Sequence, residues 1–121
     1  HAAAVMVSNQ IVALADMGTA LLVKCGFSEA AAAEALSPLL LGNAQSVAEK
    51  GAVNALTGPI ERGDAQTVSK HLQEIRKFAA ESTVGQDILT AYTALSKQLI
   101  RIAQQKHPHK DYKHLEKELE Q

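Results

Sequence analysis

Aromatic residues and cysteine are scarce in this 121-residue sequence, and neither sign of charge dominates. It has two Tyr, two Phe, no Trp and one Cys, and its 12 Lys and Arg stand against 13 Asp and Glu. Nucleic-acid binding needs a basic surface, and single-strand binding needs aromatic rings that stack on bases, so we expect no nucleic-acid partner. A lone cysteine cannot form an internal disulfide, which excludes a disulfide-stapled secreted scaffold and favours a reducing, cytoplasmic location.

A long uncharged run is also missing. The longest one near the N-terminus covers residues 2–15 and is interrupted by Ser8, Asn9 and Gln10. Because a helix needs about 20 apolar residues to cross a bilayer, we expect no membrane partner. The sequence starts with His1 directly before this run, which indicates either that residues were removed or that this is a piece of a longer chain.

Helix-forming residues are abundant instead. The sequence contains 21 Ala and 14 Leu, and strand-like alternation is absent, which predicts an all-α helical bundle. From His1 to Cys25 there is no proline, so one helix of about seven turns is expected, ended by Gly26. Ser28 is the expected N-cap of a helix over 28–37.

The middle of the chain is predicted from its proline and glycine residues. Pro38 either starts a third helix or lies within a continuous one, and Gly51 ends that helix. Residues 52–63 are expected to form a structured loop. Asp64 is the expected N-cap of the next helix, whose buried side carries Val68, Leu72 and Ile75.

The last third is predicted to hold one long helix and a tail. Ser82 or Thr83 caps the long helix, and Pro108 ends it. Leu115 and Leu119, four residues apart, favour a short surface helix. We therefore expect one helical domain over residues 1–106, with residues 107–121 as its charged helical tail.

The first predicted helix is apolar around most of its circumference. Such a helix must be surrounded, which predicts that a second subunit or a further domain covers it. Its polar residues gather in one sector, with Asn9 at the edge: His1, Ser8, Asp16 and Thr19. The sector is either a solvated stripe or one wall of a cleft in which His1, Ser8 and Asn9 face a ligand.

Other candidate residues favour structural roles. Pro108 separates His107 from the two later histidines of the tail, His109 and His114, and zinc needs three or four converging ligands, so no metal site is predicted. His71 is expected to be a hydrogen-bonded interface residue. Cys25 has no basic partner except Lys24, and we expect a buried thiol.

Several stretches together resemble a known family. They are His1-Ala-Ala-Ala-Val5 with Ser8-Asn9, Ala55-Leu56-Thr57-Gly58-Pro59-Ile60 with Arg62-Gly63-Asp64, and His71-Leu72. Over about residues 1–105 the chain resembles the C-terminal domain of a family of NADP oxidoreductases, in which it follows a Rossmann domain. That family is related to pyrroline-5-carboxylate reductase, ketopantoate reductase and the β-hydroxyacid dehydrogenases. The resemblance implies a helical fold like the 6-phosphogluconate dehydrogenase C-terminal domain.

The resemblance also implies roles for the first helix, which in such enzymes crosses the cleft beneath the nicotinamide. β-Hydroxyacid dehydrogenases place a catalytic Lys and a substrate-binding Asn four residues apart there. Asn9 takes the Asn position, but Val5 stands where the Lys would be. His1, one turn earlier, is the titratable replacement and the implied catalytic residue, since imidazole can donate a proton near neutral pH. Ser8 would join Asn9 in substrate binding.

The glycine-bearing loop corresponds to the loop with which pyrroline-5-carboxylate reductase grips substrate. The implied substrate-binding residues are Thr57, Gly58, Pro59 and Arg62. Glycine allows close backbone approach, Thr57 offers a hydroxyl, and Arg62 offers a planar fork for a carboxylate.

Together these features predict part of an NAD(P)-dependent oxidoreductase. NADP would be bound mainly by a Rossmann domain outside these residues, since no G-x-G-x-x-G motif is present. The expected partners are a second copy of the chain, that Rossmann domain and a small-molecule substrate. The fragment alone is not expected to be active. The alternative is a non-catalytic helical dimerisation or interaction module, in which the loop is only a turn.

Overall fold

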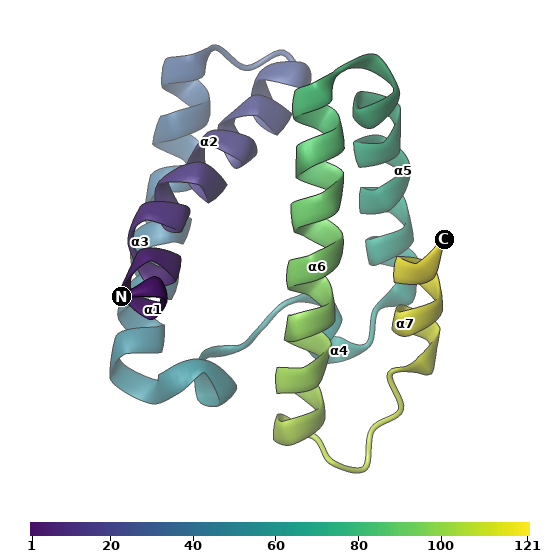
Figure 1. The fold of residues 1–121 in the computed structure, drawn as a ribbon. Coiled ribbons are helices and arrows are strands. Elements are labelled where there is room, and N and C mark those ends of the chain that lie inside the picture. Colours follow the sequence, from purple (N-terminus) through teal and green to yellow (C-terminus); the bar gives the residue numbers. More distant parts are fainter. The chain divides into compact units, whose positions relative to one another are not determined.

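The computed structural model describes residues 1–121, and its secondary structure is entirely helical, which confirms the all-α bundle (Figure 1). The chain forms two compact units, His1–Ala48 (unit 1) and Glu49–Gln121 (unit 2), which we describe separately. The helices in chain order are α1 Ala2–Val7, α2 Asn9–Lys24, α3 Glu29–Ala55, α4 Pro59–Arg62, α5 Ala65–Glu81, α6 Thr83–Lys106 and α7 Lys113–Glu120.

The first predicted helix is not continuous: Ser8 separates α1 from α2. Its backbone leaves helical geometry at φ −124° and ψ −76°, and its Oγ donates a hydrogen bond to the carbonyl of Ala4. A serine that bonds back to the preceding turn competes with the helical ladder and bends helices. The prediction of one seven-turn helix was therefore wrong at this residue, whereas Gly26 ends α2 with a φ of 101° as expected.

The remaining signals in unit 1 are confirmed. Ser28 Oγ accepts a hydrogen bond of 3.1 Å from the amide of Ala31 at the start of α3. Pro38 lies inside α3, so the continuous alternative holds. In unit 2, helical geometry breaks at Gly51 as predicted, with a φ of 80°, but α3 extends to Ala55, so the loop predicted over residues 52–63 begins only after Ala55. Within unit 1, an ideal Cβ at Gly18 would lie 3.2 Å from Leu36 Cδ1, so α2 and α3 approach closely there.

Unit 1 has almost no buried core. Ala32 is its only buried residue, and α1 and α2 bury none. Its large apolar side chains at 40% exposure or more are Met6, Val7, Val12, Leu14, Val23, Phe27, Leu39, Leu40, Leu41 and Val47. Cys25 is also exposed, so the expectation of a buried thiol was wrong: it lies in the turn after α2, beyond the helix's packed part.

The helical stretch Ala2–Lys24 is long and apolar enough to cross a membrane by length and composition alone. The uncharged run over residues 2–15 ends at Asp16, but one charged residue does not prevent a helix from meeting this criterion. One such helix near an N-terminus is weak evidence, because core helices and signal sequences meet the same criterion.

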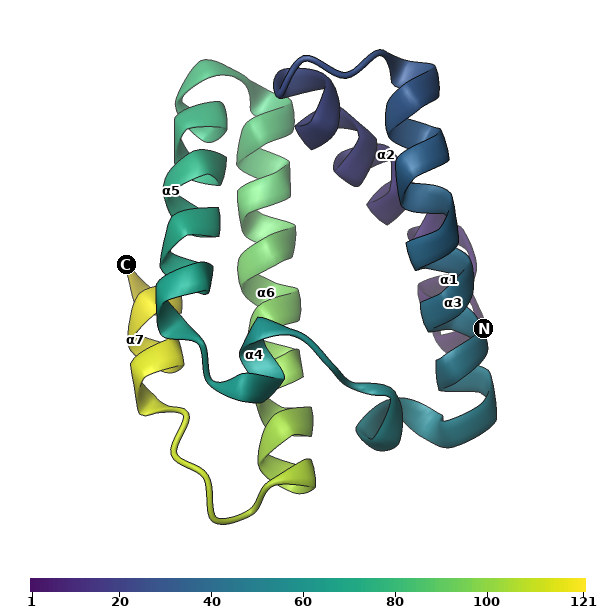
Figure 2. The same ribbon diagram turned by 180° about the vertical axis from the view of Figure 1, so that it is seen from behind.

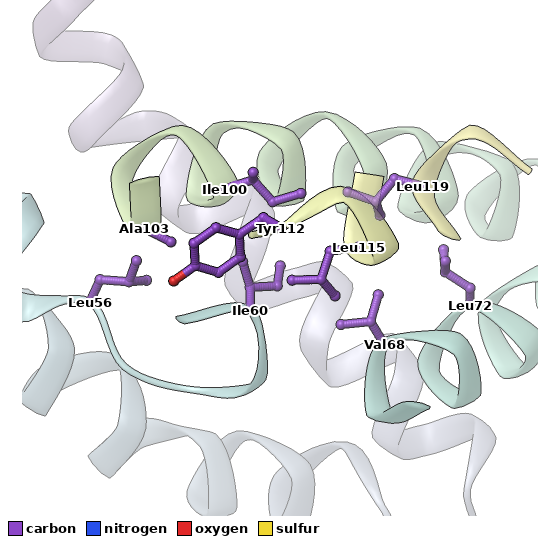
Figure 3. Packing of buried hydrophobic residues seen from close by; sticks show 9 residues of the cluster. All are labelled: Leu56, Ile60, Val68, Leu72, Ile100, Ala103, Tyr112, Leu115 and Leu119. Atoms are coloured by element: carbon purple, nitrogen blue, oxygen red, sulfur yellow. The ribbon is translucent and has the colours of Figure 1, made fainter. Parts of the chain in front are cut away.

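Unit 2 has a well-defined core. In both views α5 and α6 lie side by side, and α7 packs against both of them (Figures 1 and 2). The core cluster comprises Leu56, Ile60, Val68, Leu72, Ile100, Ala103, Tyr112, Leu115 and Leu119 (Figure 3). The predicted buried side of α5 is confirmed by Val68, Leu72 and Ile75.

The C-terminal helix forms where it was predicted but is not a surface helix. Leu115 is 1% exposed and Leu119 is 5% exposed. Residues four apart lie on one face of a helix, and α7 turns this face onto α5 and α6. The short charged segment therefore completes the core of unit 2.

Both long helices of unit 2 begin at side-chain caps. Asp64 Oδ1 accepts from the amide of Thr67 at 3.0 Å, as predicted. Of the two residues proposed to cap α6, Ser82 is the cap, and its Oγ accepts from the amide of Gly85 at 3.0 Å. The helix ends at Lys106, two residues before Pro108.

Candidate functional site

The predicted site residues fall into two groups, one in each unit. His1, Ser8 and Asn9 belong to unit 1. The loop residues Thr57, Gly58, Pro59 and Arg62 belong to unit 2.

The N-terminal group is exposed throughout. His1 is the N-cap residue of α1, but its side chain makes no capping hydrogen bond. Ser8 Oγ lies 3.3 Å from Asn9 Oδ1, and its own proton goes to the carbonyl of Ala4. The Ser8 hydroxyl is thus committed as a donor within its helix, whereas the imidazole of His1 stays accessible.

We call residues 56–63 the glycine loop. Leu56 and Ile60 are buried in the core and anchor it. Gly58 has a φ of 102° and Gly63 a φ of 75°, values that side-chain-bearing residues rarely adopt. Between them Pro59 starts the single turn α4, where its missing amide proton costs nothing. The glycine loop is therefore a turn with a defined backbone conformation.

Side chains of the C-terminal segment bind three carbonyls of the glycine loop. Lys106 Nζ donates to the carbonyl of Leu56 at 2.8 Å. Tyr112 Oη donates to the carbonyl of Glu61 at 2.9 Å, and Lys110 Nζ donates to that of Arg62 at 2.7 Å. Sequence reasoning missed all three donors, because they lie about 50 positions away and no local pattern links them to the loop.

Glu61 is the charged centre of these contacts. Its Oε1 lies 3.6 Å from Lys106 Nζ and 3.5 Å from His107 Nε2. Burial raises the pKa of Glu61, but the hydrogen bond from His107 and the charges of Lys106 and His107 outweigh it, so the pKa lies below its usual value. Burial and the Glu61 carboxylate raise the pKa of Tyr112. Glu61 is therefore an anion at neutral pH, compensated by Lys106.

The outward side of the loop offers two polar groups. Thr57 and Arg62 are exposed. Asp64 is occupied as a cap: Thr67 donates its hydroxyl to Oδ2 at 2.7 Å and its amide to Oδ1, and these bonds lower the pKa of Asp64. The loop can thus present a hydroxyl and a guanidinium to a carboxylate-bearing ligand, while Asp64 has the structural role predicted for it.

His71 lies on the exposed side of α5 and is hydrogen-bonded, as expected. Its Nδ1 and the Tyr92 hydroxyl are 3.0 Å apart, and the two rings meet edge to face at 87°. Burial raises the pKa of Tyr92. The structure contains no group of three or more His, Cys, Asp or Glu placed to hold a metal ion, and His107 instead faces Glu61.

Comparison with known protein families matches residues 1–99 to DUF2520, described as a domain of unknown function. The chain belongs to the DUF2520 family. Both groups of candidate residues lie within the matched part of this DUF2520 domain, whereas Lys106, Lys110, Tyr112 and α7 lie beyond it. No curated protein and no solved structure matches the chain.

Proposed function

We propose that this DUF2520 domain is the C-terminal substrate-binding and dimerisation domain of an NAD(P)-dependent oxidoreductase whose Rossmann domain lies outside these 121 residues. The observation that carries the proposal is the glycine loop. It is a turn of defined geometry, anchored by Leu56 and Ile60, that presents Thr57 and Arg62 to solvent. Substrate-binding groups need such fixed backbone support, and a merely connecting turn does not.

In this proposal each polar residue has its own role. Arg62 binds a substrate carboxylate, the Thr57 hydroxyl donates a second hydrogen bond, and Gly58 and Pro59 set the loop's backbone. The family resemblance separately assigns substrate contacts to Ser8 and Asn9 and proton transfer to His1. The Rossmann domain would hold most of the NADP, which would supply the hydride.

The proposed dimer explains the exposed surface of unit 1. A monomeric protein rarely leaves ten large apolar side chains of one unit open to water. α1 and α2 are also apolar around most of their circumference, so a single neighbouring helix cannot cover them. A second copy of unit 1 would bury part of this surface, as in interfaces that resemble a domain core.

The test uses a protein extended on the N-terminal side to include the expected Rossmann domain. We expect it to bind NADPH, measured by nucleotide fluorescence, whereas the 121-residue chain does not. His1→Ala in the extended protein should lower kcat by roughly 10²- to 10⁴-fold, the range typical of a lost general acid or base. Absence of NADPH binding by the extended protein would overturn the proposal.

A second candidate function is a non-catalytic helical dimerisation module, which the exposed apolar surface of unit 1 favours by itself. It predicts that His1→Ala leaves turnover of the extended protein unchanged. In that function the surface around α2 forms the dimer seam, and the glycine loop contacts no ligand. Substitutions on the α2 surface would then change oligomeric state only.

A further inference from the structure

The glycine loop has two points at which its backbone could adopt other conformations. Glycine visits positive and negative φ with similar ease, so Gly58 and Gly63 by themselves specify no single loop geometry. A carbonyl that accepts a side-chain hydrogen bond lies shortly before each glycine: Leu56 precedes Gly58, and Arg62 precedes Gly63. The donors thus fix the loop next to both of its flexible points.

These donors come from rigid supports. Tyr112 is 2% exposed, and its ring lies among Leu56, Ile60 and Ala103 in the core (Figure 3). A buried ring holds its hydroxyl in place at little cost in side-chain entropy. Lys106 is the last residue of α6, and its ammonium is directed by both the Leu56 carbonyl and the Glu61 carboxylate.

Lys110 closes the far end of the loop. Its Cε lies 3.4 Å from the place of a Cβ at Gly63, so its aliphatic chain runs directly over that glycine. Its ammonium bonds to the Arg62 carbonyl and lies 5.9 Å from the centre of the Tyr112 ring. The three donors therefore form one connected clamp of residues 106–112, outside the DUF2520 match.

We propose that Lys106 and Tyr112 are positioning residues that hold the glycine loop in the conformation in which Thr57 and Arg62 face a ligand. The clamp is inferred from the hydrogen bonds of the loop alone. Only its importance for substrate binding rests on the proposed function. The DUF2520 domain of this chain thus depends on a C-terminal segment beyond the family boundary to shape its loop.

The direct test is amide hydrogen exchange of the full 121-residue chain. The amides of Arg62, Gly63 and Asp64 report on the loop, since each is bonded to another loop carbonyl. Lys106→Met and Tyr112→Phe should each speed their exchange by roughly 10-fold, as expected for a lost hydrogen bond. Neither variant removes core packing, so the amide chemical shifts in the middle of α5 and α6 should not change.

Matched controls separate the clamp from general destabilisation. Tyr92→Phe removes a hydroxyl bonded to His71 and should leave loop exchange unchanged. Lys117→Met removes an exposed charge of the tail and should also have no effect. Lys106→Arg keeps a cationic donor, so its loop amides should exchange nearly as slowly as in the wild type. If Lys106→Met acted only through a packing defect, Lys106→Arg would not restore slow exchange.

Unchanged loop exchange in both Lys106→Met and Tyr112→Phe would overturn the clamp. A separate titration of the isotope-labelled chain with succinate tests the proposed function, since Arg62 is expected to bind carboxylates and the amides of Thr57 and Arg62 should then shift. Faster exchange in the variants without any succinate shift in the wild type would support the clamp and remove the loop from the proposed function.

Discussion

The two units differ in how many of their apolar residues they bury. Unit 2 buries eleven apolar residues, whereas unit 1 buries Ala32 alone. Of the twelve large apolar side chains that remain exposed, only Val84 and Leu95 belong to unit 2. The difference shows that apolar content does not itself make a core: the placement of apolar residues around each helix decides it.

The physical reason lies in the helix surfaces. α5 and α7 carry polar residues on one side and apolar residues on the other, so each can bury its whole apolar side against neighbours. α2 has apolar residues on nearly all sides, and a partner helix can cover only one of them. Unit 2 therefore buries its apolar residues within its own helices, while unit 1 leaves most of its apolar residues exposed.

The largest expected effect contrasts two leucines. Leu72→Ala removes a fully buried side chain of unit 2 and should lower the free energy of unfolding by about 3 kcal/mol. Leu41→Ala in unit 1, where the side chain is 70% exposed, should change it by less than about 0.5 kcal/mol. Urea unfolding followed by circular dichroism, at a protein concentration at which sedimentation shows the monomer, measures both. Equal losses of stability in the two variants would contradict the difference in burial between the units.

Two glycine-to-alanine substitutions should change the free energy of unfolding in opposite directions. A Cβ at Gly85 would lie 2.3 Å from the Phe78 carbonyl oxygen, where α6 starts beside the end of α5, so Gly85→Ala should destabilise by about 2 kcal/mol. Gly42 in α3 has open space around it, and Gly42→Ala should stabilise by about 0.5 kcal/mol through lower unfolded-state entropy. Thermal unfolding of both variants checks this, and destabilisation by Gly42→Ala would show that unit 1 is packed there.

Helix caps should behave alike in both units, because capping is local. Ser82→Ala and Ser28→Ala each remove one acceptor for a first-turn amide and should each cost about 1 kcal/mol. The threonine variants, which keep a hydroxyl, serve as controls. If Ser28→Ala has no effect while Ser82→Ala does, the start of α3 would be frayed in solution, and the difference between the units would extend to helix ends.

The smallest expected effect is the loss of stability of unit 2 at acidic pH. The pKa values of Glu61 and Asp64 are lowered in the fold, so each stabilises unit 2 above its unfolded pKa. This stabilisation is lost as the pH falls through the lowered values, below about pH 4. The urea midpoint should thus drop on acidification. Glu61→Gln with Asp64→Asn should flatten this dependence, and an unchanged slope in the double variant would contradict the assignment.

The helix boundaries that sequence predicts well are those set by one residue and its immediate neighbours. Gly26, Ser28, Asp64 and Ser82 act within three or four positions, so their roles could be predicted directly. The break at Ser8 also arises locally, but its hydroxyl competes with the helix through a hydrogen bond that composition does not reveal.

What could not be predicted depends on contacts between distant segments. The burial of Leu115 and Leu119 needs the α5 and α6 surfaces, and without them the same residues suggest a surface helix. The turn at Gly58 follows from its sequence, but the bond from Tyr112 to Glu61 spans 51 positions. The sequence thus indicated which loop to consider, although it could not show what holds that loop.

We propose that the apolar surface of unit 1 is an interface with a second copy of the chain. Sedimentation equilibrium of the 121-residue chain tests it most directly. The account predicts a mass of twice 12.9 kDa at micromolar concentration, and partial dissociation when Leu41 is replaced by Lys. A single species of 12.9 kDa across the whole concentration range would contradict it.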